Sequence, residues 1–268
     1  MICFIHIPKT AGTSFYDIVK SNYSVLLKPK VENNLSDYFE INLINNSAIR
    51  LPGGFYTAPE TLRFISNLST YELFKINFIG GHIGYGIHEI IEQKINYVSF
   101  CRDPKERLIS DFKEHHKKGR FFYNDLLKSN FNFSHYLELL LEHKLDNILT
   151  RQVAGPSDFF LKENYSVDKL LYEKALSNSY NIDFIDIKDF SVSSSYFKKK
   201  YNWKKFKNVR RNVSKSINSN TNYDDKLLNE VLKYDIKLYS EIKPLSLHKT
   251  FEDRLLNLPL KVFSNRKK

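Results

Sequence analysis

Residues 2–20 read ICFIHIPKTAGTSFYDIVK, and this stretch is the clearest indication of the fold. It opens on a short run of β-branched and aromatic residues, 2–7, which is closed by a proline and so indicates a buried strand rather than a helix. The apolar residues Phe15, Ile18 and Val19 then recur at helical spacing. The order is therefore strand, tight loop and helix, and a loop of this kind presents backbone N–H groups at a helix N-terminus.

The rest of the chain continues this alternation. Strands are expected within 77–86, at 95–100 and at 181–187; helices are expected at 59–75, from Pro104 through 118, at 134–144, at 166–176 and at 224–242. Ser134 and Ser166 are the expected N-caps of their helices, and residues 28–56 are expected to be irregular. The pattern predicts a three-layer, P-loop-like α/β fold, with a mostly parallel central sheet flanked by helices. The absence of repeats and linkers predicts a single domain over 1–268.

Composition excludes several protein classes. Of the 268 residues, 42% are hydrophobic and 26% are charged, which is a globular balance rather than that of a disordered chain. Because no run of about 18 apolar residues occurs and no basic segment precedes an apolar one at the N-terminus, we expect neither a membrane span nor a cleaved signal. Cys3 and Cys101 both lie inside apolar runs, which predicts buried thiols and a reducing, cytoplasmic compartment.

The chain is basic, with a formal net charge of +11. Such a charge favours an anionic ligand, but nucleic acid, acidic lipid, a phosphorylated cofactor and an acidic glycan all satisfy it. The most basic stretch is 198–216, where Tyr201, Trp203 and Phe206 are candidate stacking groups for single-stranded nucleic acid. A nucleic-acid-binding protein is therefore one open interpretation.

The loop from His6 to Ser14, HIPKTAGTS, is the strongest local signal. Its lysine, glycine and hydroxyl residues, placed between a strand and a helix, can hold a phosphate. It does not match the nucleotide motif G-x-x-x-x-G-K-[ST], because Lys9 precedes Gly12. A P-loop-type kinase would also need an acidic residue to hold Mg²⁺ after a core strand, for which Asp103 is the candidate. The structural alternative for the loop is an ordinary turn that caps a helix.

A second strand-to-helix junction begins with Arg102 and continues as RDPKERLISDF. An arginine fork and the hydroxyl of Ser110, two helical turns on, suit a monoester phosphate separate from the one at the first loop. Two anion sites predict a bis-phosphorylated ligand. Alternatively, Arg102 and Asp103 form a surface ion pair.

Taken together, these segments resemble the sulfotransferases that use 3′-phosphoadenosine 5′-phosphosulfate (PAPS), in the branch of the heparan sulfate and uronyl 2-O-sulfotransferases. HIPKTAGTS resembles the 5′-phosphosulfate loop of that family, and CRDPKERLISDF resembles its 3′-phosphate element. Gly81-His82-Ile83 resembles the step that presents the catalytic base, although Gly80 stands where the glycan enzymes carry a second histidine. Weaker similarities are NILTRQVAG (147–155) and NVRRNVSKS (208–216).

The resemblance implies transfer of a sulfuryl group from PAPS to an acceptor hydroxyl on a glycan or related compound, acidic acceptors included. The bisphosphate PAP would be the product, and no metal would be needed. His82 would act as the base and Lys9 would contact the bridging oxygen. The implied donor-binding residues are Lys9, Thr10, Gly12, Thr13, Ser14, Arg102, Ser110, Arg210, Arg211 and Lys215. Arg151 and Lys113 are the implied acceptor contacts. The alternative for His82 is a histidine that only caps a glycine-rich turn.

Overall fold

The computed structural model describes residues 1–28, 43–51, 64–91, 93–155, 166–188, 190–206, 224–242 and 244–245. Its strands are β1 (Ile2–Ile5), β2 (Val25–Leu27), β3 (Ser47–Arg50), β4 (Ile76–Gly81), β5 (Asn96–Cys101) and β6 (Ile182–Asp186). Its helices are α1 (Gly12–Asn22), α3 (Thr70–Lys75), η2 (Ile87–Glu89), α4 (Pro104–His115), α5 (Tyr123–Lys128), α6 (Phe133–Glu142), α7 (Ile148–Ala154), α9 (Lys169–Ser179), α10 (Phe190–Tyr201) and α11 (Asp225–Glu241).

The described residues form a six-stranded sheet in the order β2-β3-β4-β1-β5-β6, and every neighbouring pair is parallel. β1 lies in the middle, and its last residue, Ile5, is in register with Gly81 of β4 and Ser99 of β5. The carboxyl ends of these strands therefore meet at one edge of the sheet. The predicted α/β fold with a parallel central sheet is confirmed.

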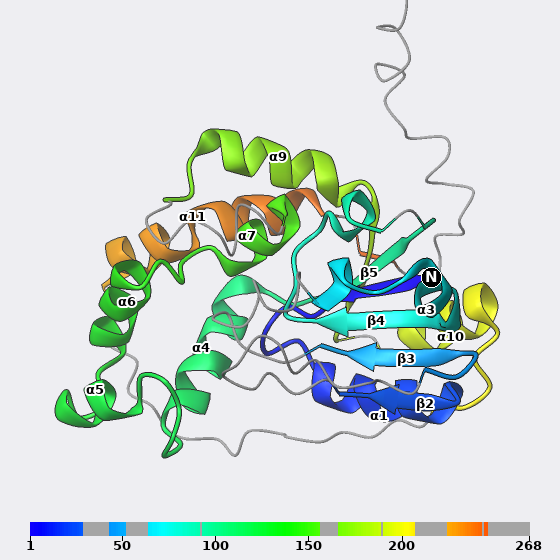
Figure 1. The fold of residues 1–268 in the computed structure, drawn as a ribbon. Helices are drawn as coiled ribbons and strands as arrows, with labels where there is room; N and C mark the ends of the chain where they lie inside the picture. The colour runs from blue at the N-terminus through cyan, green and yellow to red at the C-terminus, as the bar shows by residue number, and fades with distance from the viewer. Residues whose placement is uncertain are drawn as a thin grey trace, which may run out of the picture.

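Both faces of the sheet are covered because its strands alternate large apolar side chains between the two sides. Cys3 and Ile5 point into a core shared with α7, α9 and α11, whereas Ile2 and Phe4 point into a core shared with α1 and α10. Figure 1 shows α7, α9 and α11 above the sheet and α1 below it. The sheet is thus the middle layer of three.

A third core lies beyond the carboxyl edge of the sheet. Leu108 and Phe112 of α4 pack there against Tyr136 of α6 and Leu232 of α11. In Figure 1, α4, α5 and α6 stand beside the ends of the strands. This helical cluster places α4 next to the loops that follow β1 and β4.

Several sequence predictions need correction. The region 28–56 is not irregular throughout, because β3 lies within it. The expected helix 59–75 is interrupted, because a new helix begins after Ser69. The Ser69 hydroxyl accepts from the Glu72 N–H, and the Glu72 carboxylate accepts from the Ser69 N–H. Asn132 and Asp168, rather than Ser134 and Ser166, cap α6 and α9 by accepting from backbone N–H groups. In each case a nearby side chain of the same capping type is used instead.

Two other expectations hold, for the cysteines and for the helix at 224–242. Cys3 and Cys101 are free thiols and both are buried, as their apolar surroundings predict. The predicted amphipathic helix at 224–242 is α11. Within the part of the chain that the structure describes, no helix combines the length and apolar character needed to cross a bilayer.

Candidate active site

The loop after β1 gathers backbone N–H groups at the start of α1. His6 extends the strand pairing, since its N–H donates to the Gly81 carbonyl at 2.8 Å. Lys9 and Ala11 then take left-handed conformations, with φ of 65° and 63°. Residues that alternate in this way turn neighbouring N–H groups into an anion-binding concavity. Ala11 is the N-cap residue and has no side-chain oxygen, so an outside acceptor can serve the first turn of α1.

Gly12 is required by the imidazole of His6. A Cβ atom at position 12 would overlap the His6 ring, so no other residue fits without displacing it. His6 is itself buried, and its ring stacks with Phe4 and makes an edge-to-face contact with Tyr16. Burial lowers the pKa of His6 well below its ordinary value, so the ring is neutral and supports the loop by packing.

The hydroxyl residues of the loop differ in their surroundings. The Thr10 hydroxyl is buried and donates to the Ile7 carbonyl at 2.7 Å, so it stabilises the turn. Thr13 is exposed at the start of α1, and Ser14 is buried. Of the three hydroxyl residues of this loop that are predicted to bind the donor, Thr13 is thus the exposed one, and the Thr10 hydroxyl is engaged with the backbone.

His82 follows β4 and stacks on His6, with ring centroids 4.2 Å apart and planes 21° apart. Its Nδ1 lies 2.8 Å from the His6 carbonyl oxygen. Because a carbonyl only accepts, Nδ1 carries the hydrogen and the neutral ring has its lone pair on Nε2. Burial lowers the pKa of His82 to about 4 against the hydrogen bond to His6, and the Arg50 guanidinium adds to the lowering. Near pH 7 the ring is neutral and chemically able to accept a proton.

Gln152 of α7 ties the two loops together. Its Nε2 donates to the carbonyls of His6 and Ile83, each at 3.2 Å, and the side chain is fully buried. The His6 carbonyl therefore receives both Gln152 and His82, which fixes the orientation of the His82 ring. Sequence reasoning did not single out Gln152, although it lies inside the quoted segment 147–155.

Arg151, the neighbour of Gln152, is engaged with Asp146. It is buried, its Nε donates to the Asp146 carbonyl at 2.8 Å, and its guanidinium is 2.6 Å from the Asp146 carboxylate. The Arg151 guanidinium therefore has its ion-pair partner inside the protein. This placement disfavours the predicted contact of Arg151 with an acceptor.

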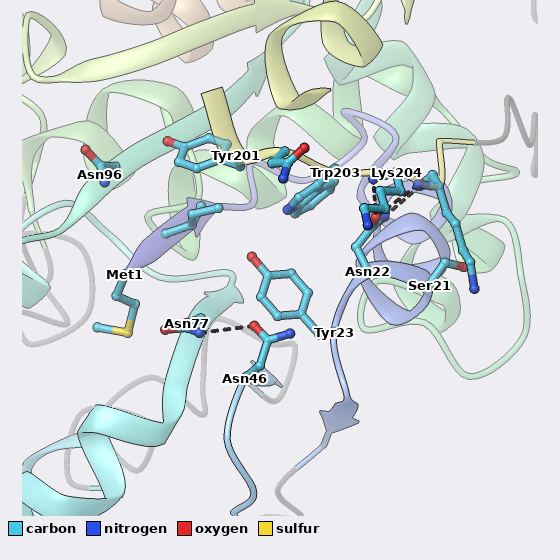
Figure 2. A pocket seen from close by; sticks show the side chains of 13 residues that line it. Met1, Ser21, Asn22, Tyr23, Asn46, Asn77, Asn96, Tyr201, Trp203 and Lys204 are labelled. Carbon is cyan, nitrogen blue, oxygen red and sulfur yellow. Dashed lines mark hydrogen bonds between the residues drawn. The ribbon is translucent and has the colours of Figure 1, made fainter. Parts of the chain in front are cut away.

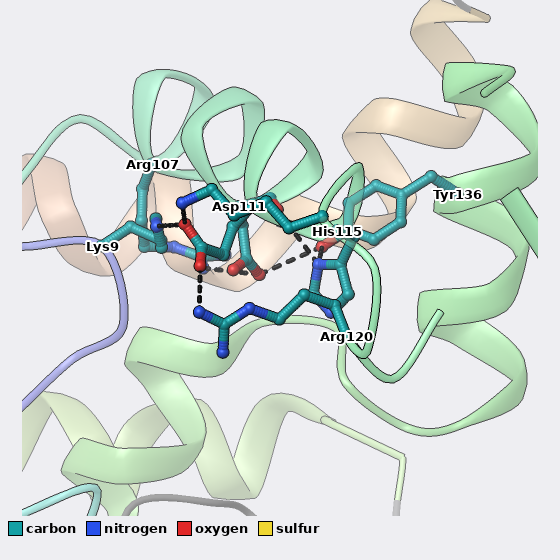
Figure 3. Close-up of polar contacts among 8 residues, drawn as sticks. Lys9, Arg107, Asp111, His115, Arg120 and Tyr136 are labelled. Carbon is teal, nitrogen blue, oxygen red and sulfur yellow. Dashed lines mark hydrogen bonds and ion pairs between the residues drawn. The ribbon is translucent and has the colours of Figure 1, made fainter. Parts of the chain in front are cut away.

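Lys9 reaches across to the C-terminal part of α4. Its Nζ lies 3.1 Å from Glu114 Oε2, and Glu114 also pairs with Lys117 at 2.7 Å and with Arg120. Figure 3 shows Lys9 and Arg120 approaching this cluster from separate segments, with Asp111 and Tyr136 beside it. Burial raises the pKa of Glu114, but the contacts with Lys117, Lys9 and Arg120 outweigh it and hold the pKa at about 2. Glu114 is therefore a charged counter-ion of Lys9.

α4 presents the second predicted phosphate element. Arg102 directly follows β5, and its Nε lies 3.4 Å from the Glu106 carboxylate. Ser110 is four residues beyond Glu106 and so lies on the same face of α4, followed by Lys113; both are half-buried. Asp103 instead caps the helix by accepting from the Glu106 N–H at 3.0 Å. The predicted pair of Arg102 with Asp103 is thus replaced by Arg102 with Glu106.

Arg50 is a cation of this edge that the sequence did not reveal. It ends β3 in register with Gly80, and its guanidinium lies 4.4 Å from the centre of the Tyr16 ring. The Tyr16 hydroxyl is buried close to the Gly80 Cα, in space that a side chain at position 80 would otherwise take. Because residues 28–56 were expected to be irregular, the sequence could not place Arg50 beside His82.

Arg210, Arg211 and Lys215 lie outside the described residues, and their predicted contacts with the donor stay predictions. The described residues contain no group of His, Cys, Asp and Glu suited to hold a metal ion.

A large pocket of about 500 Å³ lies away from these residues. It is lined by the N-terminal ends of β1, β4 and β5, with Asn22, Tyr23 and Trp203 beside them, as Figure 2 shows. Open α/β sheets bind ligands at the opposite, carboxyl edge. Because the loop of Lys9, the ring of His82 and the start of α4 converge on that carboxyl edge, we identify it as the candidate active site.

Known proteins with similar sequences agree with the predicted resemblance. The chain is 31% identical over 117 residues to "Heparan sulfate 2-O-sulfotransferase 1" of Mus musculus. It is 29% identical over 112 and 117 residues to the proteins of that name from Homo sapiens and Gallus gallus. Each match covers 41% of this chain but only 28% of the relative. No protein-family model matches the chain. The suspected relation to carbohydrate sulfotransferases is confirmed as a similarity of sequence over part of the chain.

Proposed function

We propose that this protein is a sulfotransferase that moves a sulfuryl group from PAPS to a hydroxyl group of a saccharide acceptor. The observation that carries the proposal is the convergence at one sheet edge of an anion-binding loop, Lys9 and the neutral ring of His82. The partial similarity to heparan sulfate 2-O-sulfotransferases supports the same chemistry. A saccharide is the acceptor class that those relatives suggest.

The residues present fit a donor with anionic groups at both ends. The N–H groups at the start of α1, with Thr13 and Ser14, would hold the 5′-phosphate. Arg102 and Ser110 at the start of α4 would hold the 3′-phosphate, since a guanidinium fork matches phosphate geometry. Gly12 lets the loop pack against the buried His6 ring, which occupies the space that a side chain at position 12 would take.

The donor supplies an activated sulfuryl group, and the chain supplies positioning, charge and a base. His82 Nε2 would take the proton of the acceptor hydroxyl as the new O–S bond forms. Lys9 would donate to the phosphate oxygen on which negative charge builds as the old S–O bond breaks. The hydrogen bond from His82 Nδ1–H to the His6 carbonyl fixes the direction of Nε2. The same hydrogen bond stabilises the imidazole ring after the ring has gained the proton.

The two other interpretations receive less support from particular residues. Asp103, the candidate Mg²⁺-holding residue of a kinase, has its carboxylate engaged as the cap of α4. Trp203, a candidate base-stacking residue, is buried and stacks on Phe197. Both residues therefore have structural roles that explain their presence.

Calorimetry can separate the three interpretations. We expect PAP to bind with a chelator present, because loop amides, Lys9 and Arg102 contact its phosphates without a metal. ATP with Mg²⁺ and a single-stranded oligonucleotide serve as the competing ligands. PAP binding that requires Mg²⁺, or tighter binding of either competitor, would contradict the proposal.

A further inference from the structure

We propose that Glu114 is an exchangeable counter-ion for Lys9: in the donor-free enzyme it holds the Lys9 ammonium, and the anionic oxygens of the donor take its place. This inference rests on the proposed function, since it concerns the group that meets the donor. Glu114 is thereby a positioning residue for Lys9, and donor binding includes the breaking of an ion pair within the protein.

The contact joins two separate parts of the site. Lys9 belongs to the loop after β1, whereas Glu114 lies near the end of α4, and their charged atoms are 3.1 Å apart. Only 24% of the Lys9 side chain and 18% of the Glu114 side chain are exposed, so solvent and salt screen this pair less than an open surface pair. The pair therefore sets where the ammonium stands before a ligand arrives.

Glu114 can give up Lys9 without being left unpaired. Lys117, one helical turn along the chain, and Arg120 both hold the same carboxylate, and neither belongs to the predicted donor-binding set. Removing one partner from a buried charge is costly when nothing else compensates it. Here the remaining cations compensate Glu114, and the donor compensates Lys9, so both charges stay paired on either side of the exchange.

Glu114 competes with the donor for Lys9, and it carries a full negative charge at any working pH. Burial raises the pKa of Glu114, but its cationic partners hold the pKa at about 2, so the carboxylate stays ionised. A carboxylate 3.1 Å from the ammonium must weaken the attraction of Lys9 for an incoming anion. Donor affinity is thus lower than the loop alone would give.

The test is the affinity of PAP for the Glu114→Gln protein, measured by calorimetry. Because glutamine keeps the shape but removes the charge, we expect PAP to bind about two- to fivefold more tightly, the range for a partly exposed ion pair. The matched control is Glu173→Gln, which removes the same charge from another lysine-paired glutamate, on α9, and should leave affinity unchanged. Circular dichroism and thermal unfolding establish that each variant is folded.

A double-mutant cycle isolates the route of the effect. In the Lys9→Met background, Glu114→Gln should no longer tighten PAP binding, since the exchanged contact is already absent. If Glu114→Gln does not fold, Glu114→Asp replaces it, because a side chain shorter by one methylene group withdraws its charge from Lys9, and we expect the same direction of change. Equal or weaker PAP binding by the variant, or an unchanged effect in the Lys9→Met background, overturns the exchange. A wild-type protein that binds no PAP overturns the proposed function together with the exchange.

Discussion

At the scale of single residues, the site depends on two stacked histidines that stay neutral. His6 packs under the loop and His82 is held by the His6 carbonyl, so one residue supports the other through both ring and backbone. Both have pKa values lowered by burial. A group with a lowered pKa in the folded state binds its proton less readily than in the unfolded chain. The fold is therefore destabilised as pH falls from about 6.5, the ordinary histidine value, toward about 4.

Gly12 gives the most direct test of this packing. We expect Gly12→Ala to destabilise the protein by about 1–3 kcal/mol, because the added methyl group overlaps the His6 ring and forces a rearrangement. Urea unfolding of the variant measures this loss. The control is the same substitution in a His6→Ala background, where the imidazole is absent. There Gly12→Ala should cost much less, and an equal cost in both backgrounds would show that His6 is not the reason for the glycine.

At the scale of elements, α4 connects the two predicted phosphate sites. Arg102 precedes its first turn, Ser110 and Lys113 lie along one face, and Glu114 near its end holds Lys9. A rigid helix of this length fixes the distance between the groups at its two ends. The length of α4 therefore sets the spacing that the two anionic groups of a ligand must match.

Arg102→Ala tests this role of the helix. We expect PAP binding to weaken by about 1.5–3 kcal/mol, the usual contribution of a hydrogen bond to a charged group. Adenosine 5′-monophosphate lacks the 3′-phosphate, so its affinity should scarcely change. Lys188→Ala is the matched control, because Lys188 also contacts Glu106 but has no predicted contact with the ligand. If Arg102→Ala weakens the binding of both nucleotides equally in titrations, Arg102 does not contact the 3′-phosphate.

In the whole molecule, the sequence predicts the layers better than it predicts the short strands β2 and β3. The runs around Phe4 and Val98 consist mostly of apolar residues because these central strands are buried on both faces, so the parallel sheet could be predicted. β3 is short and follows a polar segment, so its pattern was too brief to separate from a loop. Arg50, at the end of β3, was therefore not identified as a residue of the site.

Candidate site residues were predictable where a local motif carries them. Lys9, Gly12 and His82 lie next to strand ends, and the parallel topology brings such ends together. Contacts between distant segments left no local signal: Glu114 meets Lys9 across 105 positions, and Gln152 meets His6 across 146. The burial of Arg151 likewise left no local signal in the sequence, because it depends on how distant segments pack together.

Transfer of a radiolabelled sulfuryl group from PAPS to saccharides, by wild-type and His82→Ala proteins, tests whether the protein is a sulfotransferase with His82 as its base. We expect the wild type to label an acceptor and His82→Ala to lose about 10² to 10⁴ in kcat while still binding PAP, since a base contacts the acceptor rather than the phosphates. The acid limb of the wild-type profile of kcat/KM should lie near the His82 pKa of about 4, because activity rises as the ring loses its proton. His82→Ala protein that transfers the label as fast as the wild type would show that His82 is not the base.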